Sequence, residues 1–439
     1  MAISIIGFFV GIGLLVYMII KGVNMIIASV ITCIILLATA GTGFWDGLLG
    51  TYAGGAGGHY SSWFFLMLLG GIFGILVQLT GMATKIAKVV TGILRGNWMV
   101  LGIMIVAWGI CMLGINGYIS AFVTFPIFNA LLRERRMDRQ MLPLLLLAGG
   151  AIANGFPYGL DPVNVMPATL MGTSLGVIPV LGIIFTLIHT TMTCLYFNYA
   201  QGKAMSNRGE IAIMQEYEEI QADVVPDDQL PGFALSLIPF IVAFACVVIT
   251  QRAFGIPSAN AIVISLTLGI ALVLVFQFKR LKDGLKDHLS NGAVSGLTTL
   301  IIITTLVGLT RVIVANPVYQ IGVNFVLGLD MPMYLTTFFG TSIMTALTGS
   351  ALTGPTLFLE SFAEQFIANG ADPGVLHRLT TLSAMAFNKL PNAAIAVSVI
   401  AICKAKFGPA YKHILAGSVF PGFVAGLVCA LLATMGFTF

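Results

Sequence analysis

Runs of apolar residues recur along the whole chain and are separated by short polar breaks. Most runs are about 20 residues long, the length that an α-helix needs to cross the hydrocarbon core of a bilayer. The pattern therefore predicts an all-α polytopic membrane protein. Its spans are expected near residues 2–20, 24–41, 59–81, 141–167, 176–200, 233–252, 257–278, 293–315, 379–402 and 413–437.

Two further regions, 98–132 and 333–369, each contain two apolar arms around a centre rich in glycine, serine and threonine. The arms are about 13–17 residues long, too short to cross a bilayer at ordinary tilt. We expect both regions to be re-entrant hairpins. Two pairs of short full spans are the alternative.

Two of the spans, 141–167 and 379–402, are interrupted by the same motif, Asn-x-x-Pro, at Asn154–Pro157 and at Asn388–Pro391. In hydrocarbon, non-helical backbone survives only where it is buried in protein or lines a cavity. A pair of interrupted segments, one in each half of a chain, is the best sequence indication of a transporter's binding site. We therefore expect two broken helices that meet at a ligand.

The two halves of the chain also match each other. Ser120–Phe128 resembles Ser350–Phe358, with Thr124-x-Pro126 matching Thr353-x-Pro355 at an offset of 229 residues, and the two Asn-x-x-Pro motifs match at an offset of 234. Each half contains five spans and one hairpin, and two copies of an odd number of crossings run in opposite directions. We expect inverted repeats at 1–200 and 233–439, joined by a cytoplasmic linker at 201–232.

Composition agrees with this pattern, since 58% of the residues are hydrophobic and only 9% are charged, against about 25% charged in soluble domains. The spans place 17 of the 21 basic residues on one side, which the positive-inside rule makes cytoplasmic. Both termini are then extracytoplasmic, and the inner membrane is the expected location. The six cysteines show no ligand spacing, and no feature indicates binding to nucleic acid.

The hairpin centres and helix breaks offer free backbone groups, and their half-helix ends carry partial charges suited to ions. No cofactor is expected, and no metal apart from sodium that the hairpin apices could hold. The candidate residues for binding substrate and ion are Asn116, Gly117, Ser120, Thr124, Asn154, Gly155, Asp161, Asn164, Thr348, Gly349, Ser350, Thr353, Asn388, Lys389 and Asn392.

Charges inside predicted spans are costly and are functional by default. Lys389 is the candidate counter-charge for a substrate carboxylate; its alternatives are a buried ion pair with Asp161 or Glu360, or snorkelling to the interface. Asp161 and Glu360 are candidate proton carriers, although a solvated or capping role suits Glu360 better. His189 could relay protons, but a hydrogen-bonded packing role is favoured.

The glycine-rich run Leu68–Ala87, the Asn-Gly-Phe-Pro break and the Thr-Gly-Ser-Ala apex resemble the gluconate permease family of secondary transporters, within the ion-transporter superfamily. The resemblance implies cation-coupled, usually proton-coupled, uptake of small hydroxy-carboxylates by a homodimer with an elevator movement. Family members often have a proline- and histidine-containing stretch after Gly-Phe. Here Gly155-Phe156 is followed by PYGLDPVN, which favours a different acid or coupling ion.

The leading hypothesis is a symporter that couples a proton, or alternatively sodium, to a small organic acid and works by alternating access. The alternative is a cation/proton antiporter on the same architecture, in which Asp161 would exchange ions. An enzyme is disfavoured because the chain has no HExxH or GxSxG motif and no Cys/His pair at ligand spacing. The expected partners are a small carboxylate, the coupling ion, the lipid bilayer and a second copy of the chain.

Overall fold

A computed structural model describes residues 2–21, 23–41, 43–93, 98–112, 117–159, 161–218, 226–256, 258–319, 321 and 331–439. Within these ranges the chain is built from helices and connecting loops, with no β-strand. Several of the helices are long and apolar. The predicted class, an all-α polytopic membrane protein, is confirmed.

The chain begins with four helices, of which the third continues directly from a π-helical turn, Asp46–Tyr52. They are α1 (Ala2–Ile20), α2 (Met25–Ala40), α3 (Ala53–Leu79) and α4 (Met82–Ile93). The helix α3 begins six residues before the expected span at 59–81, and the π-helical turn before it packs closely against α12 (Leu285–Ala315). A Cβ atom added at Gly308 would lie 2.6 Å from the carbonyl oxygen of Tyr52.

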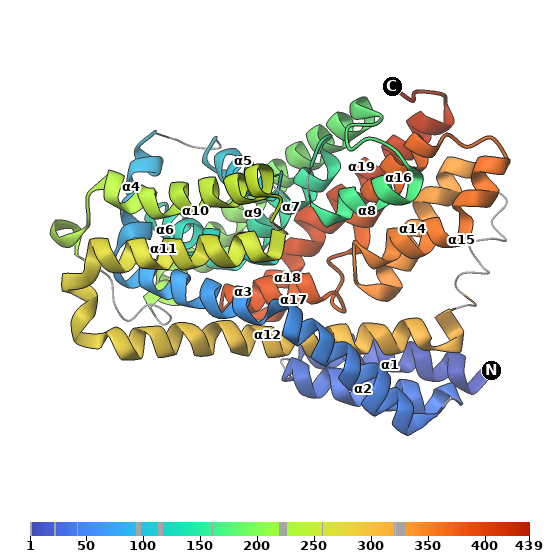
Figure 1. Cartoon of the computed structure of the whole chain (residues 1–439), viewed down its shortest axis with the longest axis horizontal. Coiled ribbons are helices and arrows are strands. Elements are labelled where there is room, and N and C mark those ends of the chain that lie inside the picture. The colour runs from blue at the N-terminus through green and yellow to red at the C-terminus, as the bar shows by residue number, and fades with distance from the viewer. Residues whose placement is uncertain are drawn as a thin grey trace.

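The second half begins with three long helices, α10 (Phe233–Phe254), α11 (Ser258–Leu281) and α12 (Leu285–Ala315). Figure 1 shows α12 along one edge of the molecule, beside α3 and next to the α1–α2 pair. Glycines line the contact between α3 and α12, where a Cβ atom at Gly292 would lie 2.6 Å from the Cα atom of Ile72. These small residues let the two backbones approach closely.

Both predicted hairpin regions consist of two short helices. Residues 113–116, between the arms of the first, lie outside the described ranges. The arms are α5 (Trp98–Met112) and α6 (Gly117–Glu134), then α14 (Met333–Thr348) and α15 (Thr353–Ala368). At 1.5 Å per residue these helices are about 23–27 Å long, below the ~30 Å thickness of a hydrocarbon core.

Both predicted broken spans are interrupted at their Asn-x-x-Pro motifs. The half-helices are α7 (Leu142–Gly155) with α8 (Pro162–Met171), and α16 (Pro373–Phe387) with α17 (Ala394–Ile402). The remaining helices are α9 (Pro179–Glu218), α18 (Phe407–Ile414) and α19 (Phe420–Thr434), with a π-helical segment, Leu415–Val419, before α19. Short 3₁₀ turns occupy Arg139–Met141, Asp227–Gln229 and Lys282–Gly284.

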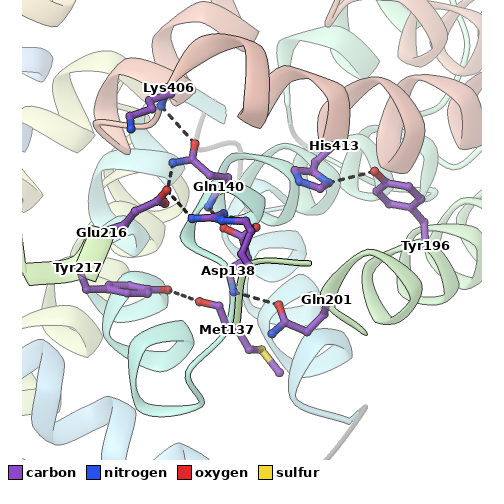
Figure 2. A network of polar contacts seen from close by, with 10 residues as sticks. Met137, Asp138, Gln140, Tyr196, Gln201, Glu216, Tyr217, Lys406 and His413 are labelled. Atoms are coloured by element: carbon purple, nitrogen blue, oxygen red, sulfur yellow. Dashed lines mark hydrogen bonds and ion pairs between the residues drawn. The ribbon is translucent and has the colours of Figure 1, made fainter. Parts of the chain in front are cut away.

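The helix α9 continues well beyond residue 200, where the expected linker begins. It kinks at Gly209, whose φ of 74° lies in the left-handed region. Beyond the kink, Ile213 and Tyr217 are fully buried in the main core. Figure 2 shows the Tyr217 hydroxyl donating a hydrogen bond to the carbonyl of Met137, at 2.9 Å. Residues 210–218 are therefore packed against the helical body.

Five helical segments in the described ranges are long and apolar enough to cross a membrane. They are Ala2–Ile19, Asp46–Leu79, Pro179–Glu218, Asn260–Ala315 and Phe407–Thr434. The largest buried cluster lies between the hairpin α5–α6, the helices α7 and α9, and the half-helix α17. The half-helices α7, α16 and α17 thus lie mostly in the interior, where protein rather than lipid surrounds them, whereas α8 exposes Val165, Met166 and Leu170.

Candidate functional site

The first helix break, between α7 and α8, follows from local sequence chemistry. Phe156 is extended (φ −75°, ψ 143°), the conformation favoured before a proline such as Pro157. Asp161 then caps α8, and its carboxylate accepts a hydrogen bond from the backbone N–H of Val163 at 2.9 Å. The carboxyl group is thereby held at the positive end of a half-helix.

The second break, between α16 and α17, is tied to the second hairpin. The Asn392 side chain donates a hydrogen bond to the carbonyl of Ala346 at 2.9 Å. Gly349 ends α14 in a left-handed conformation, with φ at 62°. A Cβ atom there would lie 2.9 Å from the Cα atom of Ala393. The apex and the break therefore touch, as expected from their paired motifs.

The two motif asparagines share an unusual property. Asn154 and Asn388 are 8% and 6% exposed, and the buried Oδ1 atom of each has no hydrogen-bond partner among the described residues. A buried amide oxygen without a partner costs about 1–3 kcal/mol. Such atoms in native proteins call for a specific explanation, and a bound ligand or ion is one. Each break thus presents one free oxygen acceptor.

Lys389, beside Asn388, is only 2% exposed. Its ammonium donates to the carbonyl of Met385 at 3.3 Å, and it forms no ion pair with any described residue. The expected alternatives are not observed, because Glu360 is exposed on α15 and Asp161 caps α8. An unpaired buried ammonium is suited to an anionic ligand.

His189 lies near this lysine. The imidazole is fully buried, stacks on Phe185 at a centroid distance of 5.8 Å, and lies 3.4 Å from the hydroxyl of Ser418. These contacts fit the packing role favoured from the sequence. Among the described residues, no group of three or more His, Cys, Asp or Glu side chains could hold a metal ion.

The second hairpin carries a row of hydroxyl groups. Ser350 accepts hydrogen bonds from the backbone N–H of Thr353 at 3.1 Å and from its hydroxyl at 3.0 Å. Thr348 donates to the carbonyl of Met344 at 2.8 Å. Two further threonines of α14 that sequence reasoning missed, Thr341 and Thr345, are buried with no partner for their hydroxyls among the described residues. Their spacing before Thr348 places all three on one helical face, a signal that the sequence contains.

The first hairpin contacts both breaks. The ring of Trp108 meets that of Phe156 edge-on at 5.3 Å, and a Cβ atom at Gly117 would lie 3.1 Å from Ile395 of α17. Ser120 and Thr124 are buried, but the Thr124 hydroxyl is already bonded to the Ser120 carbonyl at 2.7 Å. Asn116, also predicted for the site, lies outside the described residues.

The two breaks approach each other through their parent helices. Ala151 of α7 and Met385 of α16 belong to one buried cluster, and each lies three residues before its motif asparagine. Gly155 ends α7 against the ring of Phe185 on α9. The structure thus brings the two breaks and the two hairpins, from both halves of the chain, into contact with one another.

Asn164, by contrast, is occupied by structural contacts. Its amide donates to the carbonyl of Gly159 at 2.9 Å and accepts hydrogen bonds from His377 and Arg378, each at 3.2 Å. The ring of His377 also bonds the hydroxyl of Thr173 at 2.7 Å. This network holds α8 against α16 and leaves little capacity for a ligand.

Two buried arginines fix the far ends of the short half-helices. Arg378, fully buried, donates to the carbonyls of Leu175 and Val177, beyond α8. Arg139, 1% exposed, donates to the carbonyls of Cys403 and Lys404, beyond α17. Each arginine therefore comes from one half of the chain and binds the backbone that follows a half-helix of the other half. Sequence reasoning placed both in loops, because backbone carbonyls leave no signature in a sequence.

Comparisons with known proteins agree with this geometry. Residues 3–357 match the family described as GntP family permease. A protein of Bacillus subtilis (strain 168), described as the uncharacterized transporter YxjC, is 23% identical over 407 residues, which cover 82% of this chain and 84% of that protein. The chain belongs to the GntP family of permeases, which are membrane transporters and not enzymes.

Proposed function

We propose that this permease is a secondary active transporter that couples the uptake of a small organic acid to a cation gradient. The substrate class is a sugar acid or hydroxy-carboxylate, and the coupling ion is a proton, with sodium as the alternative. Membership of the permease family supports the transport of gluconate-like compounds. The observation that carries the proposal is Lys389, a buried cation with no carboxylate partner among the described residues.

The chemistry around Lys389 suits a hydroxy-acid. A buried ammonium is stabilised when an anion completes its coordination, and a substrate carboxylate would supply that charge. The amide oxygen of Asn388 would accept a hydrogen bond from a substrate hydroxyl. The threonine hydroxyls of α14 would donate hydrogen bonds to substrate hydroxyls or accept them. A site that contains one cation and several neutral polar groups selects a polyhydroxylated monoanion over an apolar acid.

Alternating access by an elevator movement is supported by the crossed arginine contacts. Arg139 and Arg378 tie the half-helices of one repeat to the other repeat, so both breaks and both hairpins can move as one body. The pair α3 and α12, packed through glycines, would form part of the static body. We propose that this static body also carries a homodimer contact.

The expected orientation is supported by contacts among loops assigned to the cytoplasm. Figure 2 shows Asp138 bonded to Gln201, and Gln140 bonded to both Glu216 and Lys406. These residues come from three separate connections that the positive-inside rule places on one side. We propose that this end faces the cytoplasm and that both termini are extracytoplasmic, with the protein in the inner membrane.

The test is transport by the purified protein in liposomes with independently imposed proton and sodium gradients. A panel of labelled sugar acids and hydroxy-carboxylates is offered, with protein-free liposomes as the control. We expect at least one acid to accumulate only under an inward cation gradient. If no acid accumulates and added sodium instead dissipates a proton gradient, the protein is a cation/proton antiporter and the proposal is wrong.

A further inference from the structure

A cavity of about 460 Å³ lies between the beginning of α3 and the end of α12, and none of its lining residues belongs to the candidate substrate site. A volume of this size is typical of sites for small ligands. The residues that define its chemistry are Gly54, Gly58, His59, Ser62, Trp63 and Arg311.

Arg311 brings a positive charge to this cavity. It lies near the C-terminal end of α12, is exposed, and forms no hydrogen bond or ion pair with any described residue. The stem of its side chain packs on Gly55, where an added Cβ atom would lie 2.7 Å from Cγ of Arg311. A guanidinium normally pairs with an anionic group such as a carboxylate or a phosphate. The protein supplies no such charge here within the described residues.

His59 provides a second, independent indication of a ligand. Its ring stacks on Trp63 at a centroid distance of 5.5 Å, and its buried Nε2 atom has no hydrogen-bond partner among the described residues. This ring nitrogen can donate a hydrogen bond to an oxyanion when the imidazole carries its proton on Nε2. The Ser62 hydroxyl, which donates to the carbonyl of Gly58 at 2.9 Å, keeps capacity to accept a hydrogen bond.

Two glycines keep the cavity open. A Cβ atom added at Gly54 or at Gly58 would meet no other atom within 4 Å. These glycines are therefore not required for close packing of α3 against α12, unlike Gly308 and Gly292. Their absent side chains leave the space in front of Arg311 free.

We propose that this cavity is an oxyanion-binding site, in which the guanidinium of Arg311 pairs with a phosphate or carboxylate group and His59 donates a hydrogen bond to it. The group can come from an anionic phospholipid or from a free organic acid. The preceding residue, Thr310, donates a hydrogen bond to the carbonyl of Thr348 at 3.1 Å. The end of α12 that carries Arg311 therefore also contacts the second hairpin apex.

The test measures thermal unfolding of the full-length protein in a neutral maltoside detergent. Two probes are titrated separately: dioleoyl phosphatidylglycerol in mixed micelles, and sodium gluconate. The variants are Arg311→Gln, which removes the charge, and Gly58→Leu, which fills the cavity. Gly57→Leu is the matched control, because an added Cβ there also meets no atom within 4 Å but the residue does not line the cavity.

We expect at least one probe to raise the unfolding midpoint by about 2–4 °C in the wild type and in Gly57→Leu. The rise should disappear in both Arg311→Gln and Gly58→Leu. A response to phosphatidylglycerol identifies a lipid as the source of the oxyanion. A response to gluconate that persists in Lys389→Ala identifies a free acid bound away from the substrate site. If neither probe raises the midpoint, or if Arg311→Gln responds like the wild type, the proposal is wrong.

Discussion

Asn154 and Asn388 connect sequence and chemistry at the scale of single residues. The sequence shows both of them three residues before a proline inside an apolar run. In the structure, Asn154 lies in the last turn of α7 and Asn388 caps the end of α16. Their unpaired oxygens could not be predicted, because hydrogen-bond partners depend on the packing of distant helices. For the same reason, the sequence did not indicate that the side chain of Asn164 is occupied. Its partners His377 and Arg378 lie in the other half of the chain.

Exchanging these asparagines for alanine should separate ligand contacts from structural ones. Asn388→Ala removes an oxygen without a partner, so we expect loss of transport with a change in stability below about 1 kcal/mol. Asn164→Ala removes a satisfied buried amide and should destabilise the protein by about 1–3 kcal/mol. Denaturation midpoints and uptake are measured in parallel. Wild-type uptake by Asn388→Ala would show that this oxygen does not contact the substrate.

Asp161 offers a test of the coupling ion. Asparagine caps helices as well as aspartate does, so Asp161→Asn should keep the cap on α8 and the stability of the fold. If the carboxyl group carries the coupling proton, the variant should bind the acid but no longer accumulate it in response to a pH gradient. Uptake is measured against external pH, and a profile identical to the wild type would exclude Asp161 from the proton pathway.

At the scale of elements, the sequence predicted long apolar spans and both broken helices well. The helices α4 and α18 were missed because they are short and carry charged residues, so neither resembles a span. The extension of α9 was missed because residues 201–218 are polar overall. Ile213 and Tyr217, fully buried after the kink, and the hydrogen bond between Glu216 and Gln140 anchor that extension to the core.

The contacts of the buried arginines with backbone carbonyls are the element-scale contacts that can be tested most cleanly. Arg378→Gln would leave the carbonyls of Leu175 and Val177 unpaired, and we expect destabilisation on the order of 1–3 kcal/mol for each group left without a partner. Lys412→Gln, an exposed change of the same charge on α18, serves as the control and should leave the unfolding midpoint unchanged. Equal midpoints for the two variants would contradict a stabilising role of Arg378 in this loop.

At the scale of the whole molecule, the connections that gather at one end could not be read from hydropathy alone. Lys406 contacts Gln140, and Arg139 contacts Lys404, across more than half of the sequence. The charge pattern nevertheless predicts that these connections lie on the same side of the membrane. The distribution of basic residues thus indicates which loops can contact one another, because loops on the same side of a membrane lie in the same narrow layer.

The orientation predicted for the whole molecule can be tested with reporter fusions. Alkaline phosphatase fused after residue 439 should be active, because it folds only outside the cytoplasm, and green fluorescent protein at the same position should be dark. Insertions after Lys282, in the turn between α11 and α12, should give the opposite pair of results. A fluorescent and phosphatase-inactive C-terminus would reverse the proposed topology.

The central claim is that Lys389 pairs with the substrate carboxylate, and uptake by Lys389→Ala in liposomes tests it most directly. Lys412→Ala, which removes an exposed lysine of α18, is the control. Both variants are reconstituted at equal amounts, with unfolding midpoints measured to confirm that each is folded. We predict that Lys389→Ala accumulates none of the acid that the wild type and the control accumulate under a cation gradient. Uptake by folded Lys389→Ala at the wild-type rate would contradict the claim.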